Sequence, residues 1–148
     1  MAHVAFTHRY AAHPDAVWEI ATDYDALAQV CAPLVRFEGL PVGQVSAGQV
    51  IEVRVRLFGL LPPEAYRMEV VACDPVARRF RSREFGAGVR DWVHDLHVLP
   101  DGRGSRIEES VEIEAGWKTP LVVQWAQILY RHRHRGRTQL LQEERVPA

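Results

Sequence analysis

The sequence has few of the features that indicate a chemistry or a cellular location. Its two cysteines, Cys31 and Cys73, lack CxxC spacing, so we expect two reduced thiols rather than a disulfide or a metal site. The 18 basic and 19 acidic side chains give a formal net charge of -1. That balance gives no general attraction to nucleic acid or to an anionic membrane, and neither is expected as a partner.

Long hydrophobic runs, repeats, low-complexity tracts and linkers are also missing. No apolar run is long enough to span a bilayer, and the first residues do not form a signal peptide, so no integral membrane contact is expected. With 148 residues and 47% hydrophobic content, we expect a single cytoplasmic domain over residues 1–148. Such a chain is long enough for a core that contains a cavity.

Signatures of metal binding and of serine chemistry are equally scarce. His132 and His134 stand two apart in a helical pattern and point to opposite sides, while His94 and His97 fall on opposite faces of a strand. The chain has no GxSxG elbow. We therefore expect neither a metal site nor a cofactor.

The longest helical pattern runs from Thr119 to about Gln142. Thr119 is the predicted N-cap and Pro120 the first helical residue. Residues at three- and four-residue spacing are expected to share one face: Leu121, Val122, Trp125, Ile128, Leu129, His132, Gly136 and Leu140. A single amphipathic helix needs an apolar surface to cover, and an antiparallel sheet supplies one.

Alternating residues ahead of this helix predict the strands of such a sheet. They cover residues 3–12, 35–38, 49–58, 64–73, 77–85, 89–99 and 105–115. Two short helices are expected after the first strand, one from Pro14 to about Ala21 and one from Ala26 to Cys31. The predicted fold class is α+β, a curved antiparallel sheet wrapped around a long C-terminal helix.

Charge alignment suggests a register for the hairpin around Gly86-Ala87-Gly88. If Phe85 pairs with Val89, three opposite-charge pairs come into line: Glu84 with Arg90, Arg83 with Asp91, and Arg79 with Asp95. Trp92 and His94 then turn toward the helix. The register across the turn at residues 100–104 is left open.

Several polar residues share the inward parity of the strands and helix, where burial is costly unless they are paired or hydrated. They are Tyr66, Glu84, Arg90, His94, Glu109, His8 and His132. A cavity that holds water or a ligand explains so many better than a dry core does. The alternative is that several lie at wet strand ends and that Glu84 and Arg90 only pair with each other.

Two features of the helix have alternative interpretations. His132 is either an acid, base or donor to a ligand or, as slightly favoured, a core histidine bonded to a backbone carbonyl or to Tyr66. The cluster Arg131, Arg133, Arg135 and Arg137 could meet an acidic ligand, but a solvated last-turn face is favoured. Tyr130 and Val123 are placed opposite the apolar face.

The order of elements and three local motifs resemble the helix-grip fold of the START-like (SRPBCC, Bet v 1-like) superfamily. The motifs are residues 12–18 (AHPDAVW) with 23–27 (DYDAL), residues 31–33 (CAP), and residues 130–135 (YRHRHR). The last is similar to the final helix of bacterial ligand-binding or polyketide cyclase/dehydrase members. Val30-Cys31 departs from the family by replacing an aromatic residue. The resemblance implies a lipid, quinone or polyketide-like ligand, or an enzyme of that kind; fold alone does not decide between them.

The sequence therefore predicts reversible binding of an apolar or amphipathic small molecule between the sheet and the C-terminal helix. The alternatives are a cyclase, dehydrase or aromatase using the same cavity, and a protein–protein regulator using the arginine-rich helix end and Leu60-Leu61-Pro62-Pro63. A homodimer is left open. The candidate ligand-binding residues are Tyr66, Glu84, Arg90, Trp92, His94, Glu109, Trp125, Leu129 and His132.

Overall fold

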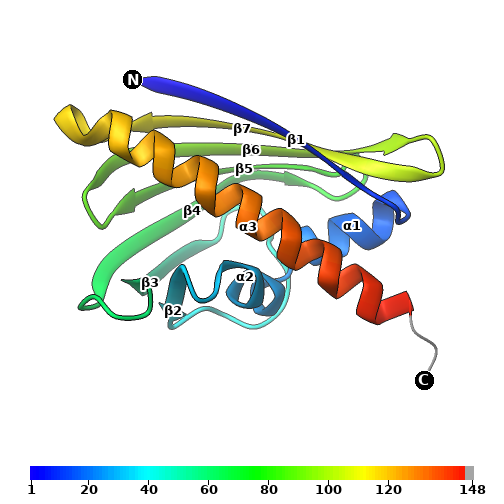
Figure 1. Cartoon of the computed structure of the whole chain (residues 1–148), viewed down its shortest axis with the longest axis horizontal. Helices are drawn as coiled ribbons and strands as arrows, with labels where there is room; N and C mark the ends of the chain where they lie inside the picture. The colour runs from blue at the N-terminus through cyan, green and yellow to red at the C-terminus, as the bar shows by residue number, and fades with distance from the viewer. Residues whose placement is uncertain (146–148) are drawn as a thin grey trace.

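A computed structural model describes residues 1–145 of the chain, and these residues form one sheet, two short helices and one long helix (Figure 1). The strands are β1 (Ala2–Tyr10), β2 (Val35–Glu38), β3 (Val50–Leu57), β4 (Glu64–Asp74), β5 (Arg79–Gly86), β6 (Val89–Asp101) and β7 (Gly104–Glu114). The helices are α1 (Pro14–Ala21), α2 (Tyr24–Cys31) and α3 (Thr119–Arg145), and a 3-10 turn, η1 (Gly116–Lys118), precedes α3.

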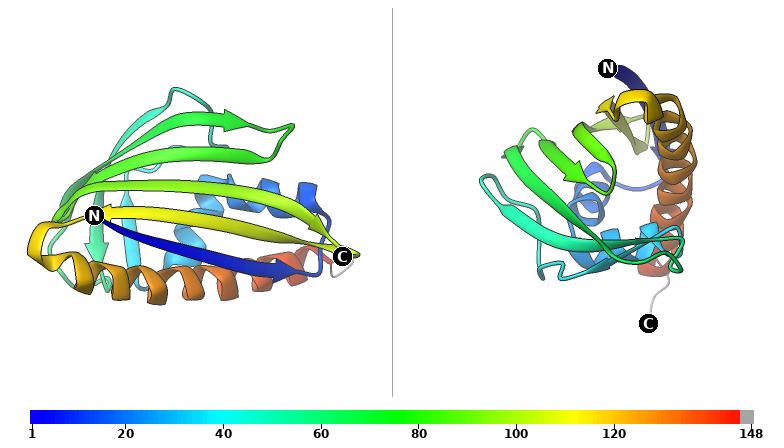
Figure 2. Two further views of the ribbon diagram at one scale, coloured as in Figure 1. Left: turned by 90° about the horizontal axis from the view of Figure 1, so that it is seen from above. Right: turned by 90° about the vertical axis from the view of Figure 1, so that its left-hand side faces the viewer.

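The seven strands are all antiparallel to their neighbours, in the order β1-β7-β6-β5-β4-β3-β2. The sheet curls into a half-barrel, and α3 runs across its concave side (Figure 2). Alternation places Ile107, Glu109, Val111 and Ile113 of β7 on the buried face, as predicted. The predicted helix-grip arrangement is confirmed.

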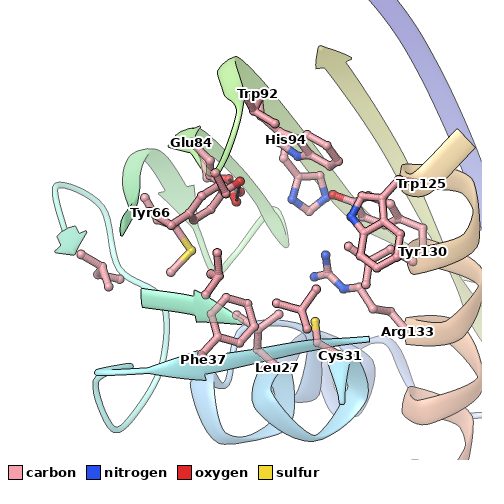
Figure 3. A pocket seen from close by; sticks show the side chains of 18 of the residues that line it. Leu27, Cys31, Phe37, Tyr66, Glu84, Trp92, His94, Trp125, Tyr130 and Arg133 are labelled. Carbon is pink, nitrogen blue, oxygen red and sulfur yellow. Dashed lines mark hydrogen bonds between the residues drawn. The ribbon is translucent and has the colours of Figure 1, made fainter. Parts of the chain in front are cut away.

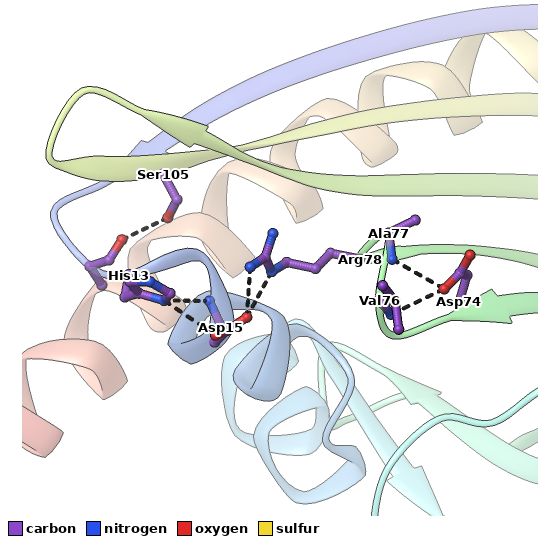
Figure 4. Close-up of polar contacts among 8 residues, drawn as sticks. His13, Asp15, Asp74, Val76, Ala77, Arg78 and Ser105 are labelled. Carbon is purple, nitrogen blue, oxygen red and sulfur yellow. Dashed lines mark hydrogen bonds and ion pairs between the residues drawn. The ribbon is translucent and has the colours of Figure 1, made fainter.

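The connection from β1 to α1 is held by short polar contacts at one end of the molecule (Figure 4). His13 caps α1, because its Nδ1 accepts a hydrogen bond from the Asp15 backbone N–H at 3.1 Å. Arg78 reaches the Asp15 carboxylate at 2.8 Å from the β4–β5 turn. The buried Ser105 hydroxyl donates to the Ala12 carbonyl at 2.9 Å. These contacts fix the angle at which α1 leaves the sheet.

The β5–β6 hairpin differs from the predicted register. The loop has two residues, Ala87 and Gly88, both at positive φ, as tight antiparallel turns require. Gly86 rather than Phe85 faces Val89, and a bulge between Glu84 and Gly86 shifts the pairs beyond it.

The shift changes the partners of the charged residues. Arg83 still reaches Asp91 at 2.9 Å, but along a diagonal, since its direct partner is Val93. Asp95 pairs with Arg81 at 2.8 Å, so the predicted pair of Arg79 and Asp95 is wrong. Charge alone could not locate the bulge, because side chains reach diagonal neighbours almost as easily as direct ones.

The buried face of α3 is also rotated from the predicted one. Leu121 and Ile128 are 63% and 55% exposed, whereas the residues facing the sheet are Ala126, Leu129, Tyr130, Arg137 and Leu141. The prediction did not include Tyr130 and Arg137, which both lie on the buried face. Thr119 is itself helical; its hydroxyl accepts from the Ala115 N–H at 3.0 Å and donates to the Gly116 carbonyl at 2.7 Å. It therefore links β7 to α3 rather than capping the helix.

Helix α2 begins two residues earlier than predicted, because Asp23 caps it by accepting from the Ala26 N–H at 3.1 Å. In β4 a bulge between Val70 and Ala72 turns Ala72 outward and packs Cys73 against the core. Of the helices described in residues 1–145, none combines the length and apolar character needed to cross a bilayer.

Candidate functional site

A cavity of ≈ 320 Å³ lies between the concave face of the sheet, α2 and α3 (Figure 3). Its walls are mostly aliphatic and aromatic. They include Leu27, Val35, Phe37, Ile51, Val55, Leu57, Met68, Val70, Phe80, Trp92, Trp125 and Leu129. The lining also contains the exposed residues Phe58, Lys118 and Leu121, so the cavity reaches the surface beside the start of α3. An apolar interior with a few polar groups is the usual composition of a small-molecule site.

Six of the nine residues predicted as ligand-binding line this cavity. They are Tyr66, Glu84, Trp92, His94, Trp125 and Leu129. Figure 3 shows Trp92 and His94 on the sheet side and Trp125 across from them on α3. Arg90, Glu109 and His132 are not among the lining residues, for different reasons.

Arg90 and His132 both turn away from the cavity. Arg90 is exposed at the start of β6, where its guanidinium lies over Gly116. It does not pair with Glu84, because the hairpin bulge places Trp92 opposite that residue. His132 lies 2.7 Å from the Ala32 carbonyl through Nε2. The carbonyl can only accept, so Nε2–H donates, and His132 ties α3 to the end of α2.

Glu84 takes its hydrogen bonds from two neutral hydroxyls. Tyr66 Oη donates to one carboxylate oxygen at 3.0 Å, and Ser82 Oγ donates to the other at 2.9 Å. Burial, together with the charge of Glu84 and the hydrogen bond to it, raises the pKa of Tyr66 well above its ordinary value. The phenol therefore stays protonated and remains a donor to Glu84.

Behind His94 lies a buried charged group formed by Glu109 of β7 and Arg137 of α3. Glu109 Oε2 is 2.6 Å from His94 Nε2, and its Oε1 accepts from Arg137 Nη1 at 3.2 Å. The three residues are 2–3% exposed. Burial alone would raise the pKa of Glu109, but the charge of Arg137 and the contact with His94 hold it well below its ordinary value.

The ionised Glu109 fixes how the His94 ring is oriented. A carboxylate can only accept, so the Nε2–H of His94 donates to it. In the neutral ring Nδ1 then carries the lone pair. His94 also lines the cavity, so this arrangement could present a proton acceptor to a bound molecule.

Arg133 is the main residue of the cavity that the sequence prediction missed. It was expected on a solvated face of the helix, yet its guanidinium points into the cavity (Figure 3). It lies 4.8 Å from the centroid of the Tyr130 ring, and its Nε is buried with no hydrogen-bond partner. The expectation of solvation is wrong for Arg137 as well, which is 2% exposed.

The spacing could have revealed these two arginines. Ala126, Tyr130, Arg133 and Arg137 follow one another at four, three and four residues, which is one helix face. Tyr130 was placed opposite the buried face, but it is 1% exposed. Arg131 and Arg135 are the exposed members of the arginine cluster, so the surface expected for a partner protein loses half of its charge.

The described side chains do not form a metal site. Within residues 1–143, whose side chains the structure describes, no three His, Cys, Asp or Glu side chains gather closely enough to hold a metal ion. Cys31 lines the cavity beside Arg133, and burial raises the pKa of its thiol. The thiol is therefore protonated near neutral pH.

Solved structures with the same fold come from several organisms. Protein CV1439 from Chromobacterium violaceum is 15% identical with a TM-score of 0.76, and the match covers 95% of this chain and 97% of that one. A START superfamily protein from Mycobacterium smegmatis is 15% identical with a TM-score of 0.72, over 95% and 97% of the two chains. Ara h 8.0201 is 14% identical with a TM-score of 0.68, over 93% and 98%.

These likenesses, with the curled sheet around α3, show that the chain has the helix-grip fold, which one of these structures shares as a START superfamily protein. A search of curated proteins gives no match. Residues 8–141 match the family described as "Domain of unknown function (DUF8410)", and the chain belongs to that family.

Proposed function

We propose that the protein reversibly binds an apolar or amphipathic small molecule in the cavity between the sheet and α3. The observation that carries the proposal is an ≈ 320 Å³ space walled by aliphatic and aromatic side chains, with a lining that reaches the surface at Phe58 and Leu121. Removing apolar ligand surface from water supplies the affinity, and the few polar groups fix the orientation. Members of this fold superfamily bind lipids, quinones and polyketides, which agrees with such a ligand.

The test is binding of a neutral fluorescent probe, 1-aminoanthracene, to the purified protein and to a variant with a filled cavity. Val55→Trp places an indole inside the cavity, whereas Val50→Trp places the same group on the exposed face of the same strand. We expect the probe to bind the wild type and Val50→Trp but to lose at least about 10-fold in affinity for Val55→Trp. Equal binding to all three proteins would contradict the proposal.

A ligand acquired in the cell can be sought directly. Native mass spectrometry of the protein purified from its own host should show a mass above that of the chain, which disappears on denaturation. Such a ligand should also raise the melting temperature of the loaded fraction by mass action. Its mass would identify the compound class without any assumed substrate.

An enzymatic function is the second candidate, and the orientation of His94 favours it. Because Glu109 accepts from Nε2–H, the lone pair of Nδ1 is the one available to take a proton. Removing a proton from the carbon beside a ligand carbonyl would give an enol or enolate, the step on which cyclases and dehydrases depend.

Proton exchange tests this candidate without knowledge of the natural substrate. The protein is incubated with an aryl methyl ketone in D₂O, and deuterium uptake at the α-carbon is followed by NMR. Catalysis by His94 predicts uptake above the protein-free rate and a loss of about 10²- to 10⁴-fold in His94→Phe. No deuterium uptake above that rate, or unchanged uptake in the variant, would contradict the enzymatic function and leave binding as the only candidate.

A further inference from the structure

Arg133 places a cation inside an apolar cavity without an anion in contact. Among the side chains described, those of residues 1–143, no salt bridge within 4.0 Å involves this guanidinium, and its Nε is buried without a hydrogen-bond partner. Its contact is with the face of the Tyr130 ring at 4.8 Å. Arg133 is half-buried, and removing a cation from water is costly unless an anion or hydrogen-bond acceptors compensate it.

The anions nearest to Arg133 are already engaged. Glu109 gives one oxygen to His94 and the other to Arg137. Glu84, across the cavity, accepts from Tyr66 and Ser82 with its two oxygens. Burial raises the pKa of both the Cys31 thiol and the Tyr130 phenol, which leaves these neighbours neutral. Water or a ligand must therefore satisfy the guanidinium.

We propose that Arg133 binds the carboxylate of an amphipathic ligand, which enters the cavity with this group first. A planar guanidinium matches the two oxygens of a carboxylate through paired N–H donors, and a charged hydrogen bond is strongest where water is excluded. The apolar part of the ligand then lies against Trp125 and Leu129 and extends toward Phe58 at the surface. This inference rests on the proposed binding function and adds the class of ligand.

The arrangement also disfavours two other kinds of ligand. A cationic group that enters the cavity would be repelled by the guanidinium of Arg133, while Glu84 across the cavity already accepts from the Tyr66 and Ser82 hydroxyls. A wholly apolar molecule would fill the space but leave the guanidinium dehydrated and unpaired, which lowers its affinity. An acid is the ligand that completes the site.

Three probes with the same alkyl chain and different head groups test the inference by calorimetry: decanoate, 1-decanol and decyltrimethylammonium. The wild type should bind decanoate about 10- to 100-fold more tightly than decanol, since a hydrogen bond to a charged group contributes in this range. Arg133→Gln should remove the preference and leave decanol binding nearly unchanged. Arg133→Lys, which keeps the charge but loses the paired donors, should retain part of it.

Arg131→Gln is the matched control, because Arg131 is exposed on the same helix two residues away. It should bind all three probes as the wild type does. Equal affinity of the wild type for decanoate and decanol, or a decanoate preference that survives in Arg133→Gln, would overturn the inference while the binding function stands. Failure of all three probes to bind the wild type would overturn both. Melting curves confirm that each variant is folded.

Discussion

Gly136 of α3 lies so close to Val30 of α2 that a Cβ built on the glycine would stand 2.9 Å from the valine Cβ and 3.0 Å from its Cα. The two helices approach at this point because no side chain separates them. The contact fixes α2 against α3, and α2 supplies Leu27 and Cys31 to the cavity wall.

The first prediction concerns Gly136→Ala. In an exposed helix this change gains about 1 kcal/mol of helix propensity, but here the new methyl group meets the backbone of α2. Overpacking costs about 1–3 kcal/mol, and contact with backbone rather than with the end of a flexible side chain favours the upper part of that range, about 2–3 kcal/mol. After the gain in propensity, we expect a net loss of free energy of unfolding of about 1–2 kcal/mol. Urea unfolding measures it, with Gln139→Ala on the exposed face of the same helix as the control. A variant as stable as the wild type would show that the helices can separate freely.

The second prediction concerns the buried carboxylate. Glu109→Ala leaves Arg137 buried and unpaired, which should cost about 3–5 kcal/mol of unfolding free energy. Glu108→Ala is the matched control, since Glu108 is exposed on the other face of β7, where it pairs with Arg106 at 2.9 Å. We expect less than about 1 kcal/mol from that surface pair.

A double variant separates two contributions to the lost stability: the missing ion pair between Glu109 and Arg137, and the cost of leaving Arg137 buried without a partner. In Glu109→Leu with Arg137→Met, neither charge remains, and apolar groups fill the space. Stability should then recover relative to Glu109→Ala, because most of the single-variant cost is the uncompensated arginine. A double variant less stable than Glu109→Ala would contradict this account.

The third prediction concerns pH and the ring stack between β1 and α3. His8 and His134 stack with centroids 4.4 Å apart, and both Nδ1 atoms are buried without a hydrogen-bond partner. Burial lowers the pKa of His134 to about 4, with His8 and Arg137 adding to the shift and Glu109 opposing it. Burial also lowers the pKa of His8, against the opposing charge of Glu109.

The sign of the effect follows from these lowered pKa values. A free histidine titrates near pKa ~6.5, so the unfolded chain takes up protons at a higher pH than the folded one. The stabilisation is complete above that pH and is lost progressively as the pH falls toward about 4, the pKa of folded His134. We expect the melting temperature to fall by several degrees between pH 7 and pH 5.

The matched variants are His134→Asn, which should flatten this dependence, and His3→Asn, which should not. His3 is exposed on the opposite face of the strand that carries His8. Glu109 titrates below this window, since its pKa lies beneath the ordinary carboxylate value, and its contribution is lost only in stronger acid. A melting temperature that stays constant from pH 7 to pH 5 in the wild type would contradict the assignment.

Much of the fold could be read from the sequence because the strand alternation is regular. The parity that buries Ile107 and Ile113 also turns Trp92 and His94 inward, and this held in the structure. The errors arose where backbone irregularity breaks the parity. A bulge shifted the β5–β6 partners, so Arg90 ended in solvent and its expected pairing with Glu84 did not form.

The site was harder to predict than the fold because the position of each polar side chain depends on a partner that is distant in sequence. From the sequence alone, Arg133 and Arg137 resemble members of a solvated cluster. The structure shows that Arg137 is instead paired with Glu109, which lies on a strand distant in sequence. His132 looked like a ligand contact, but the turn after α2 brings the Ala32 carbonyl to it at 2.7 Å. The favoured reading of His132 as a core histidine is the one the contact supports. Pairings between residues so distant in sequence can be identified only from the tertiary structure.

The last prediction uses the emission of the protein's own tryptophans to locate a bound ligand. Trp92 and Trp125 line the cavity, whereas Trp117 is 81% exposed and Trp18 packs in the core beside Phe80. A bound 1-bromodecane molecule, whose bromine quenches an indole only at contact distance, would therefore quench chiefly Trp92 and Trp125. We expect binding to lower tryptophan emission in the wild type and in Trp117→Phe by similar amounts. In Trp125→Phe the change should shrink, and in the double variant with Trp92→Phe most of it should vanish. Phenylalanine keeps an aromatic wall, so the probe should still bind, which calorimetry reports independently. Quenching that persists in the double variant but disappears in Trp117→Phe would place the probe on the outer surface and contradict a ligand in the cavity.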